Sequence, residues 1–353
     1  MPTPTIPAGN LYMNATLLTG TAATQVITNG VAGQSFQPDM VWLKSRTNVN
    51  NHTLYDSIRG VNKVLYPNLT NLEATGSEQL TAFNSNGFTL GASENANDQF
   101  GETSVGWQWK AGGAAVANTA GSIASQVSVN ANSGFSIVTY TATAADPITV
   151  GHGLGVVPSM FMVKSRSAAG TDWFVYHSSL GATKNLRLND YAAAATATNV
   201  WNDTAPTSNV ITTSNAINTN GVTYVAYCWT PIAGYSAFGS YTGNGVVDGP
   251  FVYLGFRPRW IMIKNTTFAG TTTSNWFIRD TTRDTYNVAN KHLWADLAVT
   301  ESNASYASSV YENLDILSNG FKLRNDNGGT NRSGDTFIYM AFAENPFKYA
   351  NAR

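Results

Sequence analysis

One short pattern occurs three times in this chain and constrains its fold more than any other feature. The pattern is a proline, a run of mostly apolar residues and a lysine: PDMVWLKSR at 38–46, PSMFMVKSR at 158–166 and PRWIMIKNT at 258–266. Further landmarks accompany each copy in the same order, and each copy closes on an aromatic run: VGWQW, TYVAYCW and TFIYMAF. This ordered recurrence indicates tandem duplication of a unit of about 100–120 residues.

The spacing of turns within a unit predicts an all-β fold. Short apolar runs alternate with Gly, Asn, Asp and Ser turns about every 8–15 residues, which is typical of a sandwich or jelly roll. Only 12% of residues are charged, and the neutral polar residues that replace them favour extended chain and turns over helix. We expect three tandem β-sandwich domains with little helix, at 1–113, 114–234 and 235–353, each large enough to fold alone.

The repeated pattern itself predicts a central strand covered on both faces, because its apolar run is almost continuous. Its proline stands at the strand entrance, where the missing N–H does least harm. Its lysine is expected to mark the point where the strand meets water. Tryptophans in the repeated strands are expected to pack in the core rather than to bind ligands. These are Trp42, Trp109, Trp173, Trp229, Trp260 and Trp276.

Charge and composition argue against several classes of partner. The net charge of −1 provides no attraction for nucleic acid or anionic lipid. No stretch approaches the ~20 apolar residues of a membrane span, and the N-terminus lacks the basic and apolar regions of a secretory signal. Cys228 is the only cysteine, so no intrachain disulfide is possible, and its apolar setting predicts a buried inert thiol.

No motif predicts catalysis, a metal site or a cofactor. The four histidines lack metal-binding spacing, and GHGLG at 151–155 leads into a strand rather than the helix that a phosphate loop requires. NDNGG at 325–329 lacks the glutamate of a calcium loop. The acidic residues are scattered without a repeated pair, although two of them facing each other across a groove remain an alternative. We therefore expect a protein that is not an enzyme.

Some aromatic residues lie outside the repeated strand phrases and are candidates for a binding surface. We hypothesise that they line a glycan or receptor contact in exposed loops. They are Trp201, Trp294, Tyr66, Tyr191 and Tyr286.

The repeated motifs together resemble a repeat found in bacteriophage virion proteins, especially tail fibres and appendages of phages from aquatic and cyanobacterial hosts. The resemblance rests on FQPDMVWLKSR, YDSIRG, FNSNGFTL and WQWKAGG in the first copy. The second copy contributes TYVAYCW and VWNDTAP, and the third ends in AFAENPFKYANAR. The second copy departs from the family pattern by lacking the DSxRG and NSDGF elements.

The resemblance implies a virion surface protein assembled in the host cytoplasm, with other virion proteins as partners and a homo-oligomer, by analogy a trimer. We expect a tail fibre or appendage that attaches to a glycan or protein on the host surface. One alternative is a structural protein that decorates the capsid or connects appendages without contacting a receptor. A weaker alternative is a depolymerase of surface polysaccharide.

Overall fold

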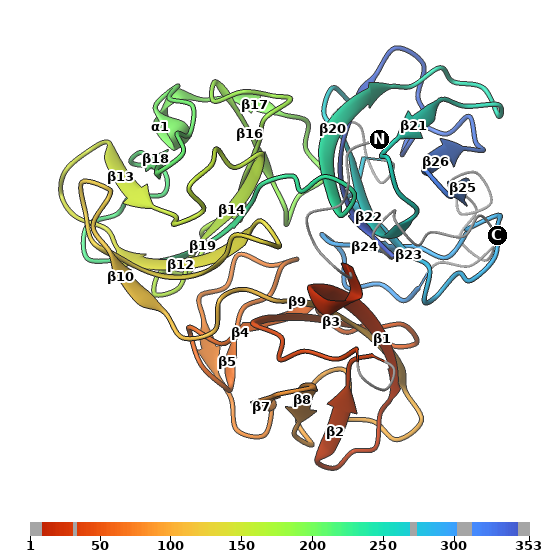
Figure 1. The fold of residues 1–353 in the computed structure, drawn as a ribbon, viewed down its shortest axis with the longest axis horizontal. Helices are drawn as coiled ribbons and strands as arrows, with labels where there is room; N and C mark the ends of the chain where they lie inside the picture. The colour runs from red at the N-terminus through yellow and green to blue at the C-terminus, as the bar shows by residue number, and fades with distance from the viewer. Residues whose placement is uncertain (1–8, 31–33, 269–273, 302–312, 345–353) are drawn as a thin grey trace.

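The computed structural model describes residues 9–30, 34–268, 274–301 and 313–344. The expected all-β class is confirmed. Helix in these ranges is confined to one 3₁₀ turn, Gly9–Leu11, and one short α-helix, α1 (Thr198–Trp201). The strands fall into three sets, one for each copy of the repeat, and we call these sets units 1, 2 and 3. Figure 1 shows the three units as lobes around a common centre.

Each unit contains one large antiparallel sheet. In unit 1 its strand order is β1 (Met13–Thr19), β9 (Thr103–Trp109), β3 (Met40–Ser45) and β4 (Thr53–Asp56). In unit 2 the order is β10 (Val116–Asn118), β11 (Ser125–Asn130), β12 (Phe135–Thr141), β19 (Thr223–Trp229), β14 (Met160–Ser165), β15 (Phe174–His177), β16 (Lys184–Arg187) and β17 (Ala195–Thr196). In unit 3 it is β20 (Ser236–Thr242), β27 (Thr336–Ala343), β22 (Pro258–Asn265), β23 (Phe277–Asp280) and β24 (Leu293–Trp294).

A smaller sheet accompanies each large one. These are β2 (Gln25–Thr28), β8 (Gly87–Leu90) and β7 (Leu80–Asn84) in unit 1, β13 (Ile148–Gly151) and β18 (Val210–Thr213) in unit 2, and β21 (Phe251–Tyr253), β26 (Gly320–Leu323) and β25 (Leu314–Leu317) in unit 3. Unit 1 also has a two-stranded ribbon, β5 (Lys63–Val64) with β6 (Ala74–Thr75). An apolar cluster lies between the large and small sheets of each unit.

The repeated proline pattern forms the same strand in every unit. β3, β14 and β22 each pair on one side with the closing aromatic strand and on the other with the following strand. All six residues of β3 and of β14 are buried. The prediction of a central strand covered on both faces is therefore confirmed, and the six tryptophans of the strand phrases are at most 1% exposed.

A fourth apolar cluster, which we call the central core, joins the three units. It takes side chains from the large sheet of every unit, and aromatic rings from different units touch within it. Trp109 of unit 1 packs edge-on against Trp260 of unit 3 at 5.4 Å between ring centroids. Apolar surface of each unit is thus removed from water by its neighbours, and the driving force for folding is shared across the ring.

The lysine of each repeated pattern lies inside the protein, so the expectation that it meets water is wrong. Lys44, Lys164 and Lys264 are at most 1% exposed. Each ammonium group donates a hydrogen bond to a backbone carbonyl of the neighbouring unit. The pairs are Lys44 Nζ to Ala298 O at 3.1 Å, Lys164 Nζ to Thr70 O at 3.2 Å and Lys264 Nζ to Tyr191 O at 2.8 Å. Carbonyls of the same unit and of the neighbouring unit together take the place of water around each charge.

A second set of hydrogen bonds joins the same pairs of units as the lysine bonds do. The Nε1 of Trp173 donates to Tyr66 O at 2.9 Å, and the Nε1 of Trp276 donates to Arg187 O at 2.8 Å. In unit 1 the equivalent residue is a histidine, and its Nε2 lies 2.8 Å from Trp294 O. Units 1 and 2, 2 and 3, and 3 and 1 are therefore joined in the same way, which closes the three units into a ring.

The three junctions differ in their charges. Arg46 pairs with Glu301 at the junction of units 3 and 1, and Arg166 pairs with Glu73 at the junction of units 1 and 2. At the junction of units 2 and 3, Thr266 and Ala194 stand at the equivalent positions and keep only a backbone hydrogen bond of 2.9 Å. This junction thus lacks the arginine–glutamate pair of the other two, and Lys264 is the cation that crosses it.

Candidate ligand-binding site

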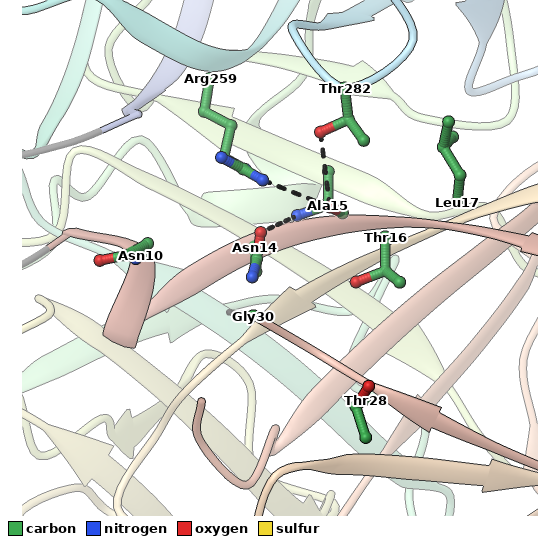
Figure 2. Close-up of a pocket in the computed structure, with 9 residues that line it drawn as sticks. All are labelled: Asn10, Asn14, Ala15, Thr16, Leu17, Thr28, Gly30, Arg259 and Thr282. Atoms are coloured by element: carbon green, nitrogen blue, oxygen red, sulfur yellow. Dashed lines mark hydrogen bonds between the residues drawn. The ribbon is translucent and has the colours of Figure 1, made fainter. Parts of the chain in front are cut away.

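A cavity of about 340 Å³ lies at the junction of units 3 and 1 (Figure 2). Strand β1 runs along it, the end of β2 closes one side, and the entrance of β22 with the turn after β23 closes the other. The lining residues are Asn10, Asn14, Ala15, Thr16, Leu17, Thr28, Gly30, Arg259 and Thr282. The site therefore combines residues that are more than 200 positions apart in the sequence.

One residue that lines the cavity is smaller than its equivalents in the other two units. The strand registers place Ala15 opposite Trp107, Ile137 opposite Tyr227 and Phe238 opposite Met340. These three first-strand residues are equivalent and all face the central core. Units 2 and 3 thus have isoleucine and phenylalanine at this place, whereas unit 1 has the smaller alanine.

Arg259 is the positively charged residue that lines the cavity. Its Nη2 lies 3.5 Å from the carbonyl oxygen of Ala15, to which the Oγ1 of Thr282 also donates at 3.4 Å. Its Nε is buried and has no hydrogen-bond partner among the described residues. Burial lowers the pKa of Arg259, and the nearby Glu344 and Asp280 partly oppose this effect. A guanidinium stays protonated at any physiological pH.

The carboxylates closest to Arg259 are committed to other cations. Glu344 pairs with Arg257 at 2.9 Å, and Asp280 pairs with Arg283 at 2.6 Å while also accepting a hydrogen bond from Trp107. Among the described residues Arg259 forms no ion pair of its own. It thus offers the cavity a positive charge that no carboxylate of the described residues neutralises by direct pairing.

The rest of the lining is neutral. Asn14 uses its Oδ1 to accept the N–H of Ala15 at 2.9 Å, and Figure 2 shows its Nδ2 pointing away from that bond toward Gly30. Thr16 Oγ1 accepts a hydrogen bond from Gln108 at 3.1 Å, and Leu17 adds an apolar side chain that is 41% exposed. None of the described lining residues is an acid, histidine, serine or cysteine. The geometry suits the binding of a small polar anion.

None of the five aromatic residues that the sequence predicted to bind a ligand lines this cavity. Trp201 and Trp294 are 0% and 5% exposed, so their expected place in exposed loops is corrected. Trp201 packs edge-on against Phe161 in the core of unit 2. Trp294 packs edge-on against His292, and its backbone carbonyl forms a hydrogen bond with His52 of unit 1.

The three tyrosines of that set have different surroundings. Tyr66 is half-buried beside the core of unit 1. Tyr191 and Tyr286 are 45% and 84% exposed, which leaves them available on the surface. Their role in binding stays a prediction.

The cysteine and the four histidines are buried inside the fold. Cys228 is fully buried as expected, and burial raises the pKa of its thiol to about 12. All four histidines are 0% exposed. The described ranges contain no group of three or more His, Cys, Asp or Glu residues placed to hold a metal ion. No helix in the same ranges is long and apolar enough to span a bilayer.

Sequence reasoning missed Ala15 and Arg259 as parts of a site. The signal was present, because Ala15 stands two residues before LLTGTA whereas Ile137 and Phe238 hold the matching places in the other copies. Arg259 likewise replaces Asp39 and Ser159 in the second position of the proline pattern. Both residues differ from their equivalents in the other units, and only the closure of the ring brings them to the same cavity.

Comparison with known proteins identifies the whole ring as the shared unit. No curated protein and no solved structure shows significant similarity to the chain. A family model described as a domain of unknown function, DUF7483, matches residues 8–346 and so spans all three units. The chain therefore belongs to the DUF7483 family.

Proposed function

We propose that this protein is a structural component of a bacteriophage virion, built into a tail fibre or related appendage that attaches to the host surface. The repeated motifs support this role, because their order resembles appendage repeats along nearly the whole chain. Binding rather than catalysis is proposed, since the cavity lining offers an arginine, amides and hydroxyls and no general acid or base within the described residues.

The observation that carries the proposal is the closure of the three units around one central core. Each unit is locked to the next by a buried lysine, and the large sheets pack on one another at the centre. Such an assembly holds its outer loops in fixed relative positions without disulfides. A rigid platform of this kind suits a surface protein that makes several weak contacts at once, because their effects multiply when geometry lets all of them engage.

The proposal is tested with purified protein and with labelled particles. Gold-labelled antibody against the chain should decorate the appendages of intact virions, and fluorescent protein should bind host cells and reduce infection when added in excess. Label on the head shell together with no cell binding would contradict attachment and support decoration of the capsid. Release of reducing sugar from host envelope would instead support the depolymerase.

A second structural role follows from the threefold arrangement. One chain already places three similar units around a centre, so a single copy presents a pseudo-threefold face that matches a trimeric partner. This favours the role of a connector between appendage proteins. Analytical ultracentrifugation should then detect one chain bound per partner trimer, whereas three chains per trimer would exclude this mode.

A further inference from the structure

We propose that the cavity between units 3 and 1 binds the carboxylate of an acidic monosaccharide, with Arg259 as the residue that recognises the charge. This inference rests on the proposed attachment function and deepens it by naming the class of ligand. Host-surface polysaccharides that contain sugar acids carry this chemistry at high density.

The residues that line the cavity predict a preference for a negatively charged ligand. The guanidinium of Arg259 is the one ionised group among the described lining residues, and its Nε lacks an acceptor. Its Nη2 reaches the carbonyl oxygen of Ala15 only at 3.5 Å, the limit of a hydrogen bond, so a ligand oxygen can provide a stronger acceptor. A guanidinium presents a planar fork that matches a carboxylate, and hydrogen bonds between the two charged groups are stronger than neutral ones.

The neutral residues of the lining indicate a ligand rich in hydroxyl groups. Asn14 Nδ2 makes no hydrogen bond with the described residues, and Thr28 lines the cavity on the other side of β1. The outward carbonyl of Ala15 already accepts from Thr282, which shows that this edge of β1 is open to polar partners. Leu17 provides an apolar surface for the carbon face of a ring.

The size of the cavity limits the ligand to about one ring. Its volume of about 340 Å³ lies at the lower end of the range of small-molecule sites, about 300–1,000 Å³. The site therefore accommodates a single residue of a polysaccharide and leaves neighbouring residues in solvent.

The other two junctions act as internal controls. Asp39 replaces Arg259 in unit 1, where it accepts the N–H of Ala111 at 2.8 Å and the hydroxyl of Ser57 at 2.8 Å. Ile137 and Phe238 are the larger residues at the position of Ala15. An arginine and a small alanine thus occur together at the junction of units 3 and 1 and at neither of the other two.

The experiment titrates the full chain with D-glucuronate, with D-glucose as the uncharged analogue and with inorganic phosphate as an anion without a ring, and follows heat or NMR shifts. We expect saturable binding of glucuronate at one site per chain, no binding of glucose, and phosphate weaker by about tenfold or more. Equal binding of glucose and glucuronate, equal binding of phosphate, or no saturable glucuronate binding would each overturn the proposal.

Two substitutions and a matched control locate the site. Ala15→Ile copies unit 2 and fills the cavity, and Arg259→Gln removes the charge; each should weaken glucuronate binding about tenfold or more. Lys184→Gln removes a positive charge that is exposed on strand β16 of unit 2, does not alter the cavity lining, and should leave binding unchanged. If Lys184→Gln weakens binding as much as Arg259→Gln, the charge effect is not local and the assignment is wrong.

The glucuronate experiment and the test of the proposed function can fail independently of each other. A chain that binds host cells but not glucuronate would retain the attachment role and lose this site. A chain that binds glucuronate but neither cells nor virion appendages would retain the site and lose the role.

Discussion

The buried lysines predict that the protein becomes more stable as the pH rises above neutrality. Burial lowers the pKa of Lys44 from 10.5 to about 7 and the pKa of Lys164 and of Lys264 to about 8. At any pH between these native pKa values and the pKa of a lysine in the unfolded chain, the unfolded chain binds more protons than the native protein. Stability must therefore increase with pH in this window, and the contribution is lost as pH falls through the native pKa.

The size of this effect follows from the pKa of Lys44 alone. With a native pKa of about 7, the linkage relation gives a gain of about 2 kcal/mol in the free energy of unfolding between pH 7 and pH 9. Methionine at this position has similar length and does not titrate. We therefore expect Lys44→Met to reduce the rise in stability between pH 7 and pH 9 by about 2 kcal/mol relative to the parent protein.

Urea unfolding followed by tryptophan fluorescence at the two pH values measures this difference. Lys184 lies exposed on strand β16, and Lys184→Met serves as the control that removes a lysine without opening a junction. The reasoning is refuted if the parent protein and Lys44→Met gain the same stability between pH 7 and pH 9. In that case Lys44 would be solvated, and the cross-unit bond to Ala298 would not shield it.

Three further predictions concern the core, a buried acid and the dependence of one unit on the others. Trp107→Ala should destabilise the protein by about 3–5 kcal/mol in urea titrations, because it opens the central core and removes the donor to Asp280; a loss below 1 kcal/mol would contradict the shared core. Burial raises the pKa of Glu94 from 4.5 to about 7, so its contribution to stability should fall as pH rises from about 4.5 to 7. Glu94→Gln should reduce this fall and leave the part due to Asp296, whose pKa burial also raises to about 7, whereas an unchanged pH profile would contradict the burial of Glu94. A fragment of residues 114–234 should show no cooperative thermal transition by circular dichroism, and a sharp transition would show that unit 2 folds without its neighbours.

The repeat made the strands predictable. Aligning the three proline patterns identified β3, β14 and β22 as central strands, and the closing aromatic runs as their partners. Local sequence sufficed here because the period of apolar residues reflects the two covered faces of one sheet. The tryptophans of these strands were assigned to the core for the same reason.

The closure of the ring was not predictable from local patterns. A lysine at the end of a strand ordinarily meets water, and the carbonyl of Ala298 that receives Lys44 lies 254 residues away. The same long-range contacts bury Trp294, which lies outside the repeated strand phrases and was therefore expected on the surface. The candidate cavity was missed because its two determinants, Ala15 and Arg259, are exceptions to the repeat in different units.

The closed ring is tested most directly by small-angle X-ray scattering of the full chain. A compact molecule of 353 residues has a radius of gyration of about 20 Å. Three separate domains of the same total length, touching in a row, would give about 30 Å. The shared central core predicts the value near 20 Å at all protein concentrations that keep the chain monomeric, and a monomer with a radius of gyration near 30 Å would contradict it.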